Sequence, residues 1–139
     1  MQKHKKIFVD TNILIDFVCN REQFYDDAET LFAMGLSGNI EISFSDISAI
    51  NTLYVGRKYG FTIEELSDQL LDVLSYCSVI PSDKRIIVEA LQSGWKDKED
   101  CTQYLSARNA DVIITRNVDD FNGQSEIAVM TPNEYLAQK

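Results

Sequence analysis

The sequence predicts an α/β fold in which a mostly parallel sheet carries helices on both faces. Five short runs rich in β-branched and other apolar residues alternate with amphipathic helical stretches, at residues 7–9, 40–44, 77–80, 112–115 and 127–130. Strands that alternate with helices form parallel sheets, because a helix returns the chain between one strand and the next. The chain has 139 residues, so we expect one domain over residues 1–139 with a core of about 6–136.

Two helix starts are marked by the residue types that cap helices. Thr62 is followed three residues later by Glu65, and Thr131 by Glu134. This spacing is that of a capping box, in which the two side chains bond each other's backbone N–H groups. Pro132 follows Thr131 at the first helical position, where its missing N–H is harmless.

The charge and cysteine content limit the class of protein. A net charge of −9 argues against binding RNA through a broadly basic surface, but it is compatible with phosphate held through metal ions and with a basic protein partner. The cysteines Cys19, Cys77 and Cys101 are widely spaced and odd in number, which predicts reduced thiols. No run approaches the roughly 20 apolar residues of a membrane span, so we expect a cytoplasmic protein without a membrane partner.

Polar side chains follow two of the predicted strands. Asp10 comes directly after residues 6–9, and Asn117, Asp119 and Asp120 come soon after residues 112–115. In open α/β sheets ligands bind beyond the carboxyl ends of strands, so these side chains are candidates for a binding site. Structural roles stay open as well, because Asp10 can cap the following helix and Asn117 and Asp119 can form a turn.

Two further polar features lie on predicted helices. Asp97 and Asp100 are three residues apart and share one helix face, although Asp97 can instead be an N-cap, with Asp100 favoured by the helix dipole. Asn51 lies within an apolar stripe that predicts a buried helix face, formed by Ile47, Ile50, Tyr54 and Val55. A polar side chain on such a face must bond either backbone or a polar pocket.

Together these features resemble the PIN-domain family. The matching segments are residues 8–17, 45–55, 96–104, 113–121 and 130–136, and they extend over nearly the whole of residues 6–136. The opening segment and the Thr115-Arg116-Asn117 segment are the most specific. The resemblance implies a three-layer α/β/α arrangement around a five-stranded sheet.

The resemblance also implies a function. Acids of the family bind Mg²⁺ or Mn²⁺ and hydrolyse RNA phosphodiester bonds, and many bacterial members are similar to the toxins of toxin–antitoxin pairs. Asp10 matches the family's first acid and Asp100 its third, while Asp97 is an acid often seen just before the third. The expected partners are RNA, an antitoxin with a basic anchor, and a second copy of the chain.

The chain departs from the family pattern at two positions. The second acid falls on Asn51, and the fourth falls on Asn117, with Asp120 close behind as a substitute. Two formal charges are therefore missing from the expected pocket. We expect Asp10 and Asp100 to hold one ion, with Asp97 or Asp120 orienting its waters and a second ion arriving only with substrate. The candidates for supporting these ligands are Thr11, Asn12 and Thr115, and Arg116 can contact either phosphate or a surface carboxylate.

Two other functions remain open. A catalytically weak or inactive PIN-like module would bind RNA or a protein partner, and the two asparagines and the acidic charge favour it. Metal affinity separates this module from a nuclease. An aspartyl-phosphate enzyme of the haloacid-dehalogenase kind would also place an Asp after the first strand and a Thr at the end of a later one, as Thr115 is. That chemistry needs a second acid where this chain has Asn12, so it ranks low.

Overall fold

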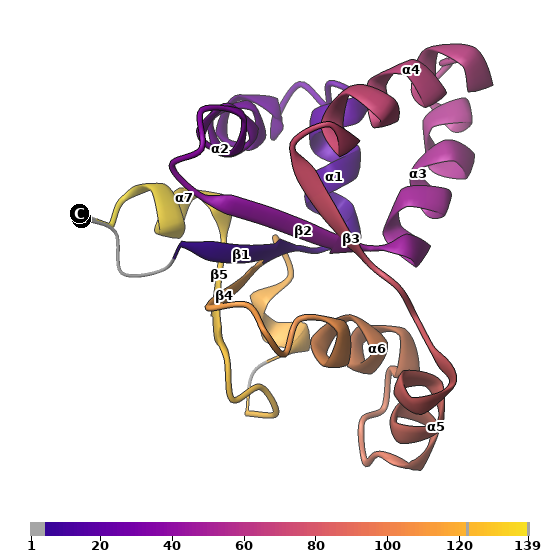
Figure 1. Ribbon diagram of the computed structural model, residues 1–139, viewed down its shortest axis with the longest axis vertical. Coiled ribbons are helices and arrows are strands. Elements are labelled where there is room, and N and C mark those ends of the chain that lie inside the picture. The colour runs from indigo at the N-terminus through magenta and orange to yellow at the C-terminus, as the bar shows by residue number, and fades with distance from the viewer. Residues whose placement is uncertain (1–4, 122, 139) are drawn as a thin grey trace.

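A computed structural model describes residues 5–121 and 123–138 (Figure 1). In these residues five parallel strands form one sheet in the order β3-β2-β1-β4-β5. The strands are β1 (Lys6–Val9), β2 (Glu41–Ser45), β3 (Cys77–Ile80), β4 (Val112–Ile114) and β5 (Ala128–Met130). The predicted α/β class and the parallel sheet are confirmed, and each strand boundary lies within one residue of its predicted position.

Helices cover both faces of the sheet, as Figure 1 shows. One face carries α1 (Thr11–Val18), α2 (Tyr25–Leu36), α3 (Asp46–Lys58), α4 (Ile63–Leu74) and α7 (Pro132–Leu136). The other face carries α5 (Lys84–Gln92) and α6 (Lys98–Ser106), and a 3₁₀ turn, η1 (Val118–Asp120), follows β4. Both predicted capping boxes are present at the starts of α4 and α7.

The core alternates between the two faces along the central strand. Ile7 and Val9 belong to the cluster that includes α1, α2 and α4 residues, whereas Phe8 packs with Ile113 and Phe121 on the other face. All of these side chains are buried. A strand that is buried on both faces is typical of a parallel sheet, and it holds the end of β1 rigidly in place.

The buried face of α3 differs from the prediction. Ile50 and Tyr54 are 53% and 66% exposed, so the predicted buried face was wrong for these two residues, whereas Val55 is half-buried and packs against the core. The buried residues of α3 are the small Ser48, Thr52 and Gly56. A Cβ on Gly56 would lie 2.5 Å from Leu66 Cδ2, so α3 needs small side chains on this face to pack so closely.

The composition predicted no membrane-spanning segment and reduced cysteines. No helix in residues 5–121 and 123–138 is long and apolar enough to cross a bilayer. Cys19, Cys77 and Cys101 are all free, with Cys19 and Cys101 buried.

Candidate functional site

The strand order reverses beside β1, and the predicted polar residues meet there. The chain builds β2 and β3 on one side of β1 and then places β4 and β5 on the other side. Ligands in open α/β sheets bind in the crevice at such a switch point, beyond the carboxyl ends of the strands. Asp10 follows β1 and residues 115–117 follow β4. The Asp10 N–H donates to the Ile114 carbonyl at 2.9 Å, which joins the two segments.

Asp10 is 8% exposed and accepts three hydrogen bonds. Its Oδ1 accepts from the Thr11 backbone N–H at 2.9 Å and from Gln103 Nε2 at 3.0 Å. Its Oδ2 accepts from the Thr115 hydroxyl at 2.9 Å. Each carboxylate oxygen has about two lone pairs, so Oδ1 is fully used and Oδ2 keeps one lone pair. Asp10 therefore caps α1 and can still bind a cation through Oδ2.

The other hydrogen bonds of Thr115 determine that its hydroxyl donates to Asp10. Its Oγ1 accepts hydrogen bonds from the Asn117 backbone N–H at 3.0 Å and from Asn12 Nδ2 at 3.3 Å. With both lone pairs used, the hydroxyl hydrogen goes to Asp10. Asn12 Oδ1 in turn accepts from the Arg116 N–H at 3.3 Å. Asn12 and Thr115 thus hold the ends of β1 and β4 together around the carboxylate.

The start of α6 brings a second carboxylate to this edge of the sheet. Asp97 is the N-cap, and its Oδ1 accepts from the Asp100 N–H at 3.0 Å. Burial, together with repulsion from Asp97, Asp120 and Asp10, raises the pKa of Asp100 to about 7. The four acids predicted from the sequence therefore lie close enough for three of them to affect the fourth. An acid whose proton is held this firmly marks a place where added positive charge would be stabilised.

The other predicted residues, Asp120, Asn117 and Asn51, are linked to this cluster less directly. Asp120 is exposed at the end of η1, where it contributes to the raised pKa of Asp100. Asn117 is exposed at the start of η1, and its backbone reaches the site through Thr115. Asn51 is half-buried on α3, three residues beyond Ser48, a residue whose side chain contacts Thr11 beside Asp10.

The donor set suits a loosely held magnesium or manganese ion. Within the described ranges, no three His, Cys, Asp or Glu side chains form a ready-made metal site. Asp10 and Asp100 supply two carboxylates, and Mg²⁺ often takes only one or two from a protein, completing its shell with water and phosphate oxygens. Hard carboxylate oxygens also favour Mg²⁺ and Mn²⁺ over softer metals.

Comparison with known proteins identifies the family. The family model described as "PIN domain" matches residues 6–119. The chain belongs to the PIN-domain family. A chain of VapBC2 from Rickettsia felis, solved bound to a DNA fragment from its promoter, has the same fold, with a TM-score of 0.63 and 18% identity over 89% of this chain and 96% of that one. No curated protein matches this PIN domain.

The sequence singled out Thr11 but not Gln103, Ser48 and Ser45, which form a hydroxyl and amide network with it in this PIN domain. Gln103 Nε2 lies 2.9 Å from Ser48 Oγ and 3.2 Å from Thr11 Oγ1. Ser48 Oγ lies 2.6 Å from Thr11 Oγ1 and also accepts from Ser45 Oγ at 3.0 Å. The sequence did contain one indication that Gln103 lies near the acids, because it follows Asp100 by three residues and so shares its helix face.

Arg116 forms an ion pair with a buried carboxylate. Its Nε donates to Asp16 Oδ2 at 2.7 Å, and Arg21 lies 3.6 Å from the same carboxylate, which is 1% exposed. Burial raises the pKa of Asp16 although both arginines oppose that change. The Arg116 guanidinium also lies 3.9 Å from the centroid of the Phe24 ring. Of the two roles that the sequence left open for Arg116, the structure shows an ion pair, and its carboxylate is the buried Asp16 and not a surface acid.

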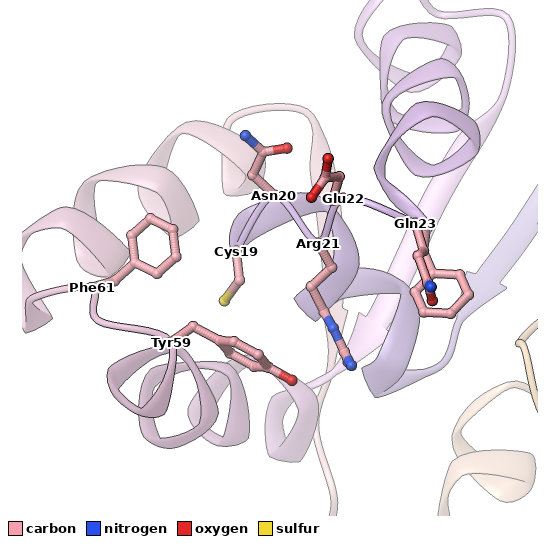
Figure 2. Close-up of a pocket in the computed structure, with 8 residues that line it drawn as sticks. Cys19, Asn20, Arg21, Glu22, Gln23, Tyr59 and Phe61 are labelled. Atoms are coloured by element: carbon pink, nitrogen blue, oxygen red, sulfur yellow. The ribbon is translucent and has the colours of Figure 1, made fainter.

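A separate hollow lies at the other end of α1 from Asp10. It has a volume of about 460 Å³, and Arg21 and Tyr59 approach each other across it, with the guanidinium 5.1 Å from the ring centroid (Figure 2). Cys19 and Phe61 also line it. The acids at the sheet edge do not line this hollow, so the candidate site is defined by its chemistry and by the strand order.

Proposed function

We propose that this PIN domain is an endoribonuclease that uses Mg²⁺ or Mn²⁺ to hydrolyse RNA. The observation that carries the proposal is the convergence of Asp10, with one free lone pair on Oδ2, and Asp100, with a pKa raised to about 7, at the switch point of the sheet. Such a site is poor in positive charge and attracts divalent ions. A bound ion would supply an activated water and would stabilise the leaving oxygen.

The chain's own residues have separate tasks in this proposal. Asp10 and Asp100 would hold the ion, Asp10 through Oδ2. Asp97 and Asp120 would accept hydrogen bonds from water around the ion, because each is a charged acceptor near Asp100. The side chains of Asn51 and Asn117 would donate to or accept from RNA or water, which their amides allow without adding charge. Thr115 keeps the Asp10 carboxylate fixed.

We extend the proposal to a toxin held in check by an antitoxin. The support is the fold that this PIN domain shares with a chain of VapBC2, together with the acidic site. A basic side chain inserted near Asp10 and Asp100 would pair with both acids and occupy the place of the ion, as charge complementarity at an interface favours. Assembly with a second copy of the chain is part of the same proposal.

An RNA cleavage assay with site variants tests the proposed activity. The purified chain should cleave RNA with Mg²⁺ or Mn²⁺, and EDTA should stop the reaction. Asp10→Asn should reduce cleavage to the EDTA level while the circular dichroism spectrum stays unchanged. Asp68→Asn, an equal charge change at an exposed position on α4, is the matched control and should cleave normally.

The same assay also tests the alternative function, a non-catalytic PIN-like module. A wild-type chain that binds RNA or a partner but does not cleave, with or without metal, would be the non-catalytic module. The replacement of two acids of the family pattern by Asn51 and Asn117 is the feature that favours this outcome. Cleavage that persists in Asp10→Asn would instead mean that the activity belongs to another site or to a contaminant.

A further inference from the structure

Gln103 occupies a position at which a polar side chain is costly. It is 2% exposed on α6, and its Oε1 is buried without a hydrogen-bond partner in the described part of the chain. A buried acceptor without a partner is destabilising, and an apolar side chain of similar length would avoid that cost. The hydrogen bonds that Nε2 donates must therefore account for the presence of Gln at this position.

The nitrogen end of the amide faces Asp10. Gln103 Nε2 lies 3.0 Å from Asp10 Oδ1 and 2.9 Å from Ser48 Oγ. The chemistry of the neighbours fixes this orientation, because a rotated amide would place Oε1 against the carboxylate oxygen, and two acceptors cannot bond each other. The amide nitrogen has two hydrogens, and each has an acceptor in this arrangement.

The hydrogen bonds divide the two oxygens of Asp10 between different tasks. Oδ1 receives Gln103 Nε2 and the Thr11 N–H and has no lone pair left. Oδ2 receives only the Thr115 hydroxyl. Without Gln103, Oδ1 would regain a lone pair, and the carboxylate could turn toward a ligand with either oxygen. Fixing a ligating carboxylate by outer hydrogen bonds is a general way to tune a metal site.

We propose that Gln103 is a positioning residue that holds Asp10 so that Oδ2 alone faces the metal ion. This inference rests on the proposed function, because it assigns Gln103 a task at the same site. Gln103 does not bind the ion, and it acts through Asp10. Its position on the same helix face as Asp100 links the two carboxylates mechanically, since α6 carries both Asp100 and the amide that orients Asp10.

Calorimetric titration of the full chain with Mn²⁺ tests the inference without RNA. Gln103→Met keeps the side-chain length and removes the donor, and it should weaken Mn²⁺ binding about 10–100-fold, the usual effect of losing an outer hydrogen bond to a metal ligand. Gln69→Met makes the same change at an exposed position on α4 and should leave the affinity unchanged.

A destabilised control separates positioning from general damage. Leu70→Ala removes buried side-chain volume from α4, far in sequence from the site, and should lower the urea midpoint while leaving Mn²⁺ affinity unchanged. If Gln103→Met does not fold, Gln103→Leu serves instead, because it also removes the donor and adds no charge beside Asp10. It should weaken binding by a similar factor.

Three results would overturn the inference, and they are distinguishable. A folded Gln103→Met chain that binds Mn²⁺ within twofold of wild type removes the inference and leaves the proposed function standing. Equal losses of affinity in Gln103→Met and Leu70→Ala would reduce Gln103 to a structural residue. A wild-type chain without Mn²⁺ affinity at millimolar concentration would remove the proposed metal chemistry and the inference together.

Discussion

Replacement of Asp100 by Asn should make the metal-free protein more stable, although Asp100 is a proposed metal ligand. Burial and the neighbouring acids raise the pKa of this carboxyl from its ordinary 3.8 to about 7. A raised pKa means that the ionised form is disfavoured in the folded state relative to the unfolded chain. Asn has a similar shape and no charge, so the substitution removes this unfavourable ionisation and leaves the packing nearly unchanged.

The sign and size of the effect follow from proton linkage. Between about pH 4 and pH 7 the folded state keeps a proton that the unfolded chain has released, so the stability of the wild type falls as pH rises through this interval. For Asp100, a pKa of about 7 in place of 3.8 corresponds to roughly 4 kcal/mol. Asp100 is partly open to solvent, and screening there reduces the expected cost to about 1–2 kcal/mol.

Thermal melts of the two proteins in EDTA, at pH 4 and at pH 8, measure this difference. Asp100→Asn should melt about 3–8 °C above wild type at pH 8 and at nearly the same temperature at pH 4, where the wild-type carboxyl is protonated. Asp68→Asn on the exposed face of α4 controls for the change in net charge. The proposed crowding of acids would be refuted if Asp100→Asn melted no higher than wild type at pH 8, or if its melting temperature exceeded that of wild type equally at both pH values.

Three further predictions address packing, the missing charge and the partner. Gly56→Ala should lower the free energy of unfolding in urea by about 1–3 kcal/mol, because its Cβ would lie 2.5 Å from Leu66 Cδ2. Gly94→Ala has open space around it and should change the free energy of unfolding by less than about 0.5 kcal/mol. Equal effects of the two substitutions would contradict the packing of α3. Asn51→Glu should tighten Mn²⁺ binding in calorimetry, and unchanged or weaker affinity in a folded variant would place Asn51 away from the ion. Asp100→Ala should weaken binding of an antitoxin by about 2 kcal/mol or more in a titration, and unaffected binding would rule out a basic anchor at this acid.

The parts of the fold that depend on local chemistry were predictable from sequence. Strand ranges followed from short β-branched runs, and the starts of α4 and α7 followed from Thr62 and Thr131 with their capping partners. The position of Asp10 was predictable for the same kind of reason, since it depends on one strand end. The sequence could not choose between a capping role and a binding role, and the structure shows that the cap uses Oδ1 and leaves a lone pair on Oδ2.

The parts that depend on close approach between elements were not predictable. The α3 pattern favoured burial of Ile50 and Tyr54, but the fully buried residues of α3 are small ones such as Gly56, where Leu66 comes too close for a larger side chain. Gln103 was missed for a related reason. A glutamine in the middle of a helix is ordinarily a surface residue, and only the packing of α6 beside Asp10 brings its amide into the site. The partner of Arg116, Asp16, lies 100 residues away in the chain and left no local signal.

Anomalous diffraction from crystals soaked in Mn²⁺ would locate the proposed ion. We expect one ion at the carboxyl edge of the sheet, bound by Asp10 through Oδ2 and by Asp100, with water in its other positions. The ion should be lost in Asp10→Asn crystals and retained in Asp68→Asn crystals. An ion bound through Asp10 Oδ1, an ion elsewhere on the chain, or no ion at a Mn²⁺ concentration that supports RNA cleavage would show that the proposed metal site is wrong.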